Sequence, residues 1–292
     1  MLSVNDLVLK YTPVVYLHPW EKYMPVPAEW YIKRSELRTM NDTMLVGKGM
    51  VNDAALAEYP SKSKLILTDK KDYDGTDESV LDEVPVYAHY KLLVSSDGVP
   101  CCYEINYMYL FAYNAARFGV GGHQGDWEHI TVRVDVTNQD LMAVRYNNHK
   151  SWEGTWVSAK KVPLSASGQI VAYCALGGHG FWPTTGLQPR VYIVGSDLTS
   201  SHGPVWQPKY IMIMDRAVTG APSRVHGTSP FTESKKIDGN TNEDAQVQVI
   251  GEQWLKYAGE WGTSESIPVR GWFRGLVQNT SGNFWKRIFP HC

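Results

Sequence analysis

The fold is decided by residues 104–136, EINYMYLFAYNAARFGVGGHQGDWEHITVRVDV. From residue 128 onward this stretch alternates between two sets of side chains, as a half-buried strand does. One set is Glu128, Ile130, Val132, Val134 and Val136, and the other is His129, Thr131, Arg133 and Asp135. An aromatic run at 102–113 precedes the strand and predicts a second long strand beside it. The rest of the chain is expected to fold around these two strands.

Three polar side chains come together at the start of the alternating strand. Asp126 and Glu128 are two residues apart and therefore point to the same side. Two such carboxylates repel each other unless a cation or several hydrogen-bond donors compensate them. His123 precedes them on a glycine-rich loop that lets its imidazole fold back toward them. The three predict a divalent-metal site or an acid–base pair, and the alternative is that backbone amides and Arg133 satisfy the carboxylates.

The run GGHQGDWEH resembles sequence motifs of two known families. It is similar to the GHRHDWE heptapeptide of the necrosis- and ethylene-inducing-peptide-like cytolysins. It is closer to the GDWEH segment of the family named after vacuolar protein sorting-associated protein 62. In the cytolysins a histidine, an aspartate, a glutamate and an upstream aspartate hold a cation that membrane damage requires. The resemblance therefore implies His123, Asp126 and Glu128 as ligands, with Asn114 as a weaker, neutral ligand in place of the upstream aspartate.

Four further blocks extend the resemblance to the sorting-protein family over most of the chain. They are KYTPVVYLHPWEKYMP near the N-terminus, RYNNHKSWEGTW at 145–156, YCALGGHGFWPTTG at 173–186 and WLKYAGEWG at 254–262. The blocks occur in the same order as in that family. The resemblance thus indicates a family more strongly than it indicates a function.

Short strands separated by Gly, Pro and Ser connections predict a mainly β fold. The expected architecture is an antiparallel β-sandwich, jelly-roll-like, with a few short peripheral helices and long loops. We expect one domain over 1–292, with a mobile excursion at 215–245 and a charged loop at 62–79. Further strands are predicted at 14–17, 84–94, 142–146, 170–176, 191–194 and 210–214, and helices at 1–10 and 54–59.

Composition excludes some classes of protein. The 292 residues are 43% hydrophobic, which is enough for a sizeable core. A net charge of −2, a pI near 6.5 and the lack of a basic stripe argue against nucleic acid as a partner. No run of about 20 apolar residues predicts a transmembrane segment. Residues 1–13 do not look like a signal peptide, which favours the cytoplasm over secretion without fixing the compartment.

The cysteines and several other residues are expected to have structural roles. Cys101, Cys102, Cys174 and Cys292 are expected to be reduced thiols, although a bridge from Cys101 or Cys102 to Cys174 stays open for an exported chain. His18 and Glu21 are expected to be exposed loop residues. Trp261 is expected to belong to the core.

Two more histidines lie where a predicted strand gives way to a glycine-rich loop. His149 and His179 occupy these positions, as His123 does, and the three could converge at one mouth of the sandwich. Oxygen ligands with one imidazole would suit Mg or Ca, whereas several histidines would suit Mn, Fe or Zn.

Three function classes follow. The first is a cytolysin-like, metal-dependent recognition module for a sugar headgroup, a glycolipid or a peripheral membrane surface, in which Trp127, Trp152, Trp156, Phe181 and Trp182 contact the ligand. The second is an enzyme acting on a small molecule in an aromatic pocket, with Glu128 as base and His149 or His179 as acid. The third is an interaction scaffold. No Gly-x-Ser-x-Gly elbow or phosphate-binding glycine loop is present in the sequence.

Overall fold

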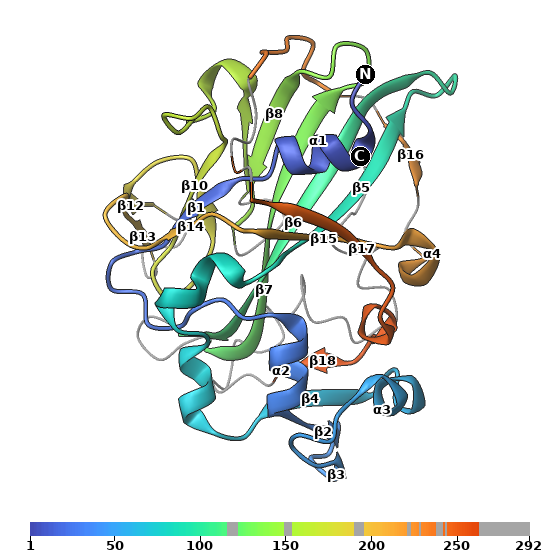
Figure 1. Ribbon diagram of the computed structural model, residues 1–292, viewed down its shortest axis with the longest axis vertical. Helices are drawn as coiled ribbons and strands as arrows, with labels where there is room; N and C mark the ends of the chain where they lie inside the picture. The colour runs from blue at the N-terminus through green and yellow to red at the C-terminus, as the bar shows by residue number, and fades with distance from the viewer. Residues whose placement is uncertain are drawn as a thin grey trace.

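The structure is a computed structural model that describes residues 1–115, 122–148, 154–189, 196–220, 223–227, 229–237, 242 and 244–262. Its largest sheet is built on two long antiparallel strands, β6 (Pro100–Asn114) and β7 (His123–Asp135) (Figure 1). Their register places Asn114 opposite His123 and Tyr109 opposite Glu128. The predicted strand pair is therefore confirmed, with β7 beginning at His123 rather than at residue 128.

Strands on both sides extend this pair to an eight-stranded sheet with the order β17-β15-β5-β6-β7-β8-β9, and β16 also pairs with β5. The antiparallel neighbours are β5 (Val86–Val94), β8 (Leu141–Tyr146) and β9 (Thr155–Ser158). The parallel ones are β15 (Tyr210–Met214), β16 (Arg224–His226) and β17 (Gln246–Ile250). The mainly β class is confirmed, but the sheet is mixed, because long connections bring the later strands back in parallel.

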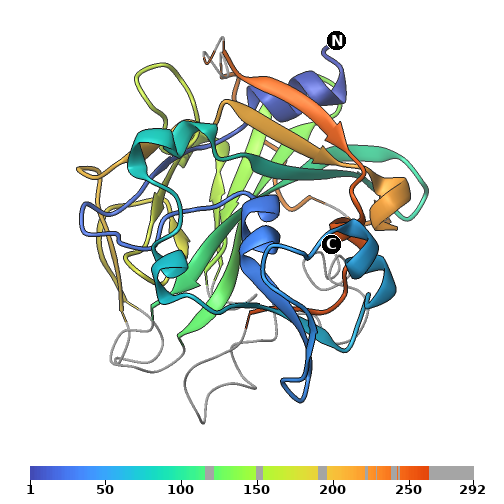
Figure 2. The same cartoon turned by 60° about the horizontal axis from the view of Figure 1, so that its bottom comes forward.

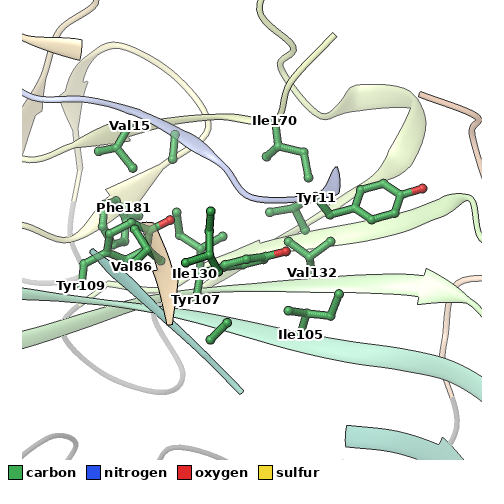
Figure 3. Close-up of a cluster of buried hydrophobic side chains, with 14 of the residues drawn as sticks. Tyr11, Val15, Val86, Ile105, Tyr107, Tyr109, Ile130, Val132, Ile170 and Phe181 are labelled. Carbon is green, nitrogen blue, oxygen red and sulfur yellow. The ribbon is translucent and has the colours of Figure 1, made fainter. Parts of the chain in front are cut away.

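A second sheet packs on one face of the large sheet. It consists of β11 (Phe181–Trp182), β10 (Val171–Cys174), β1 (Val14–Tyr16) and β14 (Val205–Trp206), in that order. Figure 3 shows Val15, Ile170 and Phe181 meeting Tyr107, Tyr109 and Ile130 of the large sheet in one buried cluster. Helix α1 (Val4–Lys10) adds Leu7 and Val8 to this cluster, which we call core 1. A small pair, β12 (Gly186–Gln188) and β13 (Asp197–Thr199), completes this side.

The opposite face of the large sheet carries a third layer. It contains helices α2 (Ala28–Arg34) and α3 (Asp53–Glu58), a 3-10 helix at Gln253–Lys256, and a sheet of β18 (Glu260–Trp261), β4 (Ser63–Leu67), β2 (Ser35–Thr39) and β3 (Met44–Val46). Figure 2 brings this layer forward. Met108, Leu110 and Trp127 of the large sheet join it in a second cluster, core 2. Trp261 is buried there, which confirms its predicted core role.

Several sequence predictions need correction. Strand β4 lies inside the predicted charged loop 62–79, and all five of its residues are buried. Helix α2 is not among the predicted helices. Pro27 precedes its first turn, where a missing N–H costs no helical hydrogen bond. Among its described residues the predicted excursion 215–245 contains α4 (Arg216–Thr219) and β16, and its mobility stays a prediction. The predicted strand at 191–194 lies outside the described residues. Within the described part of the chain, every helix is too short or too polar to span a bilayer.

Candidate functional site

The centre of the candidate site is the carboxylate of Asp126, near the start of β7, which is only 3% exposed. Three side chains meet it. Asn114 Nδ2 donates to Oδ2 at 2.9 Å, His179 Nδ1 lies 2.8 Å from Oδ2, and His123 Nε2 lies 3.0 Å from Oδ1. The structure therefore brings together three of the four predicted metal ligands and one of the two additional histidines.

The backbone at Gly125 explains how His123 reaches Asp126. Residues three apart in a regular strand point to opposite faces. Gly125 has a φ of +65°, a left-handed conformation that interrupts the alternation and that glycine adopts without strain. A Cβ at this position would lie 2.6 Å from the carbonyl oxygen of Trp261. Gly125 thus permits both the change of backbone direction that brings His123 toward Asp126 and the close approach of β18.

His179 enters the site from the turn between β10 and β11, so the network joins the two sheets. Its backbone has a φ of +54°, and its ring is fully buried. The ring stacks on Phe111 with centroids 3.9 Å apart and an interplanar angle of 3°. Its second nitrogen, Nε2, lies 3.6 Å from Oε1 of Glu21. We call Glu21, Asn114, His123, Asp126 and His179 the Asp126 network.

Glu21 is the residue that the sequence prediction missed. Its side chain is 1% exposed, whereas an exposed loop position was expected. The backbone amides of Gly177 and Tyr23 donate to its carboxylate at 2.7 and 2.9 Å. His18, also predicted to be exposed, is buried. The signal for Glu21 was its place in the block KYTPVVYLHPWEKYMP, but nothing in that block links it to residues 100 to 160 positions away.

Electrostatics make His179 a buried cation. Burial by itself would lower its pKa, but the carboxylates of Glu21 and Asp126 outweigh burial and raise the pKa to about 9. Burial would raise the pKa of Asp126, yet His123 and His179 hold it well below its usual range. His179 lowers the pKa of Glu21 against burial in the same way. At neutral pH one imidazolium therefore lies between two carboxylates.

Glu128 adds a further carboxylate on the same side of β7. It shares this side with Asp126 and with the core residue Ile130, as the alternation predicted. Burial raises the pKa of the Cys174 thiol, and the charges of Glu21, Glu128, Asp126 and Asp197 raise it further. Four carboxylates thus lie within electrostatic reach of one buried thiol.

The predicted ligand-contacting aromatic residues do not gather around this site. Trp127 packs in core 2 on the far face of the large sheet, and Phe181 packs in core 1. Both rings are buried, so we assign them to packing rather than to ligand contact. Trp156 lies over Arg133, with its ring centroid 4.4 Å from the guanidinium carbon, also on the far face.

Trp182 keeps a partly exposed ring and donates from Nε1 to Asp197 Oδ2 at 3.0 Å. Because Phe181 points into core 1, the side chain of Trp182 points to the opposite face of the second sheet. His149 and Trp152 lie outside the described residues. Cys101, Cys102 and Cys174 are free thiols.

The donor atoms around Asp126 can be compared with those that a divalent cation requires. Within the described ranges, no group of three or more His, Cys, Asp and Glu side chains is already arranged as a metal site. However, His123 Nε2 and Asp126 Oδ1 are 3.0 Å apart. Two adjacent ligands on an octahedral ion with bonds of about 2.1 Å have a separation of about 3.0 Å. The same separation is that of the hydrogen bond between the two groups, so a cation at this place would replace that hydrogen bond and take both atoms as ligands.

The fold and the site together define a mainly β protein with a buried carboxylate–imidazole network between two packed sheets. The family described as Vacuolar protein sorting-associated protein 62 matches residues 108–201, which confirms the resemblance to that family. The matched range contains every member of the Asp126 network except Glu21.

Two relatives from Saccharomyces cerevisiae (strain ATCC 204508 / S288c) match nearly the whole chain. Vacuolar protein sorting-associated protein 62 is 22% identical over 302 residues, covering 91% of this chain and 61% of the relative. Putative vacuolar protein sorting-associated protein TDA6 is 21% identical over 315 residues, covering 92% and 62%. The chain therefore spans about three fifths of the length of these relatives.

Among solved structures, the chain can be compared with the crystal structure of Necrosis and Ethylene inducing Protein 2 from the causal agent of cocoa's Witches Broom disease. It has 12% sequence identity and a TM-score of 0.34, and the match covers 75% of this chain and 72% of that one.

Proposed function

We propose that the chain is a divalent-cation-dependent recognition module that binds a sugar headgroup, free or on a glycolipid at a membrane surface. The observation that carries the proposal is the 3.0 Å separation of His123 Nε2 and Asp126 Oδ1, with Glu128 on the same side of β7. In this proposal Asn114 keeps the hydrogen bonds that its Nδ2 donates to Asp126 Oδ2 and to the carbonyl oxygen of Gly178, and it orients the carboxylate rather than binding the cation. A bound cation would supply open coordination positions to ligand hydroxyl groups.

Asp126 offers one of its two carboxylate oxygens to a cation. His179 and Asn114 occupy Oδ2 of Asp126, so Oδ1 is the oxygen that remains beside His123. His179 is then a positioning residue that orients the carboxylate and is not itself a ligand. The predicted oxygen-rich set with one imidazole corresponds to Mg or Ca rather than to Zn.

A second candidate function is an enzyme that uses His123 in acid–base chemistry. The observation in its favour is that the His123 side chain is 21% exposed while Asp126 holds its Nε2. An imidazole held by a carboxylate can move a proton to or from a ligand. The predicted roles of Glu128 as base and His179 as acid do not favour the enzyme. The imidazole of His179 is fully buried and stacked on Phe111, so it cannot contact a substrate.

The test measures cation binding and then ligand binding. Isothermal titration with MgCl₂, CaCl₂ and MnCl₂ should detect binding to the wild-type chain. Glu128→Gln and His123→Gln should each weaken that binding at least about tenfold, because each removes a ligand. Asp97→Asn, in the exposed turn between β5 and β6, is the matched control and should bind like the wild type.

Leakage of dye from glycolipid vesicles should require the same cation and should fail in Glu128→Gln. If the wild-type chain binds none of the three cations at millimolar concentration, the recognition proposal is wrong. Cation-independent turnover of a small molecule that His123→Gln abolishes would support the enzyme. If Glu128→Gln and His123→Gln changed only thermal stability, the remaining interpretation would be the interaction scaffold.

A further inference from the structure

The outermost strand of the large sheet, β17, has an open edge. It stands at the end of the strand order β17-β15-β5-β6-β7-β8-β9, and within the described part of the chain it pairs with β15 and with no other strand. Figure 2 shows it in orange at the rim of the molecule. An edge strand presents a row of backbone donors and acceptors that can pair with another strand. The groups that β17 presents therefore determine what it can bind.

Two hydrogen bonds fix the orientation of the β17 backbone. The amide of Gln246 donates to the carbonyl oxygen of Lys209 at 2.7 Å, and the carbonyl oxygen of Ile250 accepts from the amide of Asp215 at 2.8 Å. The N–H and C=O of one strand residue point to the same side, and this side alternates from residue to residue in a parallel pair. The first and last residues of β17 therefore face β15.

The residues between them divide into an inward and an outward set. Gln248 faces β15, as Gln246 and Ile250 do, whereas Val247 and Val249 direct both of their backbone groups away from the sheet. Among the residues that the structure describes, no backbone hydrogen bond reaches these outward groups. The edge thus offers two donors and two acceptors.

The side chains of β17 leave this edge accessible and uncharged. Gln246 and Gln248 are exposed on the side of core 2, and Val249 is 53% exposed on the side of core 1. Edge strands that avoid association commonly carry a lysine, a proline or a bulge. The sequence of β17, QVQVI, has neither charge nor proline, and its register with β15 is continuous. These features favour pairing with a further strand.

We propose that β17 pairs with β17 of a second copy of the chain, antiparallel about a two-fold axis at Gln248. In this register Val247 of each copy lies opposite Val249 of the other, and the two residues exchange both of their N–H···O bonds. The two donors and two acceptors of each copy are then all used. Gln248 lies opposite its counterpart as a pair without backbone hydrogen bonds. The two large sheets become one continuous sheet.

Acidic residues on both sides of β17 limit this pairing. Asp244 precedes the strand and Glu252 follows it, and in the proposed register Asp244 of one copy faces Glu252 of the other. Like charges at opposite positions repel, so the contact is confined to Gln246–Ile250. A contact of this length is smaller than a standard interface between proteins. The dimer should therefore be weak and reversible.

The dependence of the molecular mass on concentration tests the proposal. Sedimentation equilibrium of the full chain from about 1 to 500 µM should show a monomer–dimer equilibrium with a Kd on the order of 10–100 µM. The Kd should be lower in about 0.5 M NaCl than in about 0.05 M, because salt screens the repulsion between Asp244 and Glu252. A chain that remains monomeric at the highest concentration in both salts would overturn the proposal.

Substitutions at Val249 distinguish the backbone donor from the side chain. Val249→Pro removes an outward N–H from each copy but no hydrogen bond to β15, so the dimer should weaken at least about tenfold while the fold is kept. Val249→Lys keeps the N–H and places like charges near the two-fold axis, so it should weaken the dimer to a similar extent. Val249→Thr keeps both the N–H and the branched shape, and should dimerise like the wild type. A dimer that neither Val249→Pro nor Val249→Lys weakens would contradict the proposal.

Cysteine substitutions test the register. Opposite residues without backbone hydrogen bonds in an antiparallel pair have Cα atoms about 4.5 Å apart, a separation that a disulfide can bridge. Gln248→Cys should therefore form a disulfide-linked dimer on mild oxidation. Gln246→Cys, which lies opposite Ile250, should give no more cross-linked dimer than the wild-type chain with its own thiols. Equal cross-linking of the two variants would show that the proposed register is wrong.

Discussion

At the scale of single residues, His179 determines the electrostatics of the Asp126 network. Its imidazolium faces Asp126 from β7 and Glu21 from the loop after β1, and Phe111 from β6 covers its ring. Removing a buried ion from such a group leaves its partners uncompensated, which typically costs about 3–5 kcal/mol. The Asp126 network therefore stabilises the fold in addition to forming the candidate site.

The raised pKa of His179 predicts a loss of stability at alkaline pH. Its pKa in the folded chain, about 9, is above the unfolded value of 6.5, so its contribution is complete below about pH 6.5 and lost as the pH rises through 9. The difference corresponds to about 3 kcal/mol of unfolding free energy. Urea unfolding in EDTA from pH 6 to 9.5 should show this decrease, and His179→Gln should be less stable at pH 6 and lack it. His226→Gln, an exposed histidine, should keep the wild-type profile; an unchanged profile in His179→Gln would contradict the assignment.

The sequence predicted much of this network, and physical reasons explain the rest. Asn114, His123 and Asp126 lie close together in sequence, so motif and strand periodicity identified them. Glu21 could not be found because its contact with His179 depends on how the second sheet docks on the first. Trp127 was predicted to contact the ligand, but it lies between Asp126 and Glu128 in the strand. Its side chain therefore points to the opposite face, into core 2.

At the scale of secondary structure elements, the start of β7 is fixed by its contact with β18. Gly125 lies against the backbone of Trp261, and a Cβ on Gly262 would collide with the backbone of Gln124. Both glycines have positive φ values, +65° and +85°. The segment that carries His123 and Asp126 is thus held by backbone contacts from the third layer.

Two glycine substitutions distinguish the contribution of this contact to stability from the cost of backbone strain. Gly98→Ala, at φ +81° with no atom near the added Cβ, should cost only the left-handed penalty of about 1–2 kcal/mol. Gly125→Ala should cost about 1–3 kcal/mol more, because the added Cβ overpacks against Trp261. The measurement is urea unfolding of both variants. Equal losses would show that the β7–β18 contact is not tight.

Sequence patterns found the elements better than they found the pairing. The strands at 14–17, 84–94, 102–113, 142–146 and 210–214 correspond to β1, β5, β6, β8 and β15, because alternation and aromatic content are local properties. Parallel pairing of β15 with β5 and β17 depends on long connections that leave no local signature. Strand β4 was missed because its lysine and serine positions are buried by the third layer, which no local pattern reveals.

At the scale of the whole molecule, the large sheet lies between two different layers. Core 1 joins it to the second sheet, and core 2 joins it to the layer of helices and β2–β4. Each face of β6 and β7 therefore contributes to a separate core. This arrangement ties the stability of both layers to the same two strands.

The prediction of one domain can be tested on the two cores. Phe181→Ala in core 1 and Trp254→Ala in core 2 should each lower stability by about 3–5 kcal/mol. If the layers unfold together, circular dichroism and tryptophan fluorescence should give one coincident transition in the wild type and in both variants. A variant with two separated transitions would show that the layers unfold independently, contrary to the one-domain prediction.

The surroundings of Cys174 have a chemical consequence for the site. Oxidants and alkylating reagents attack the thiolate, and both burial and the nearby carboxylates keep this sulfur protonated. Among the residues that the structure describes near these carboxylates, the Cys174 thiol is therefore protected from oxidants while the two sheets stay packed. If the proposed cation binding at Asp126 is correct, it should be equally strong in reducing and in oxidising buffers.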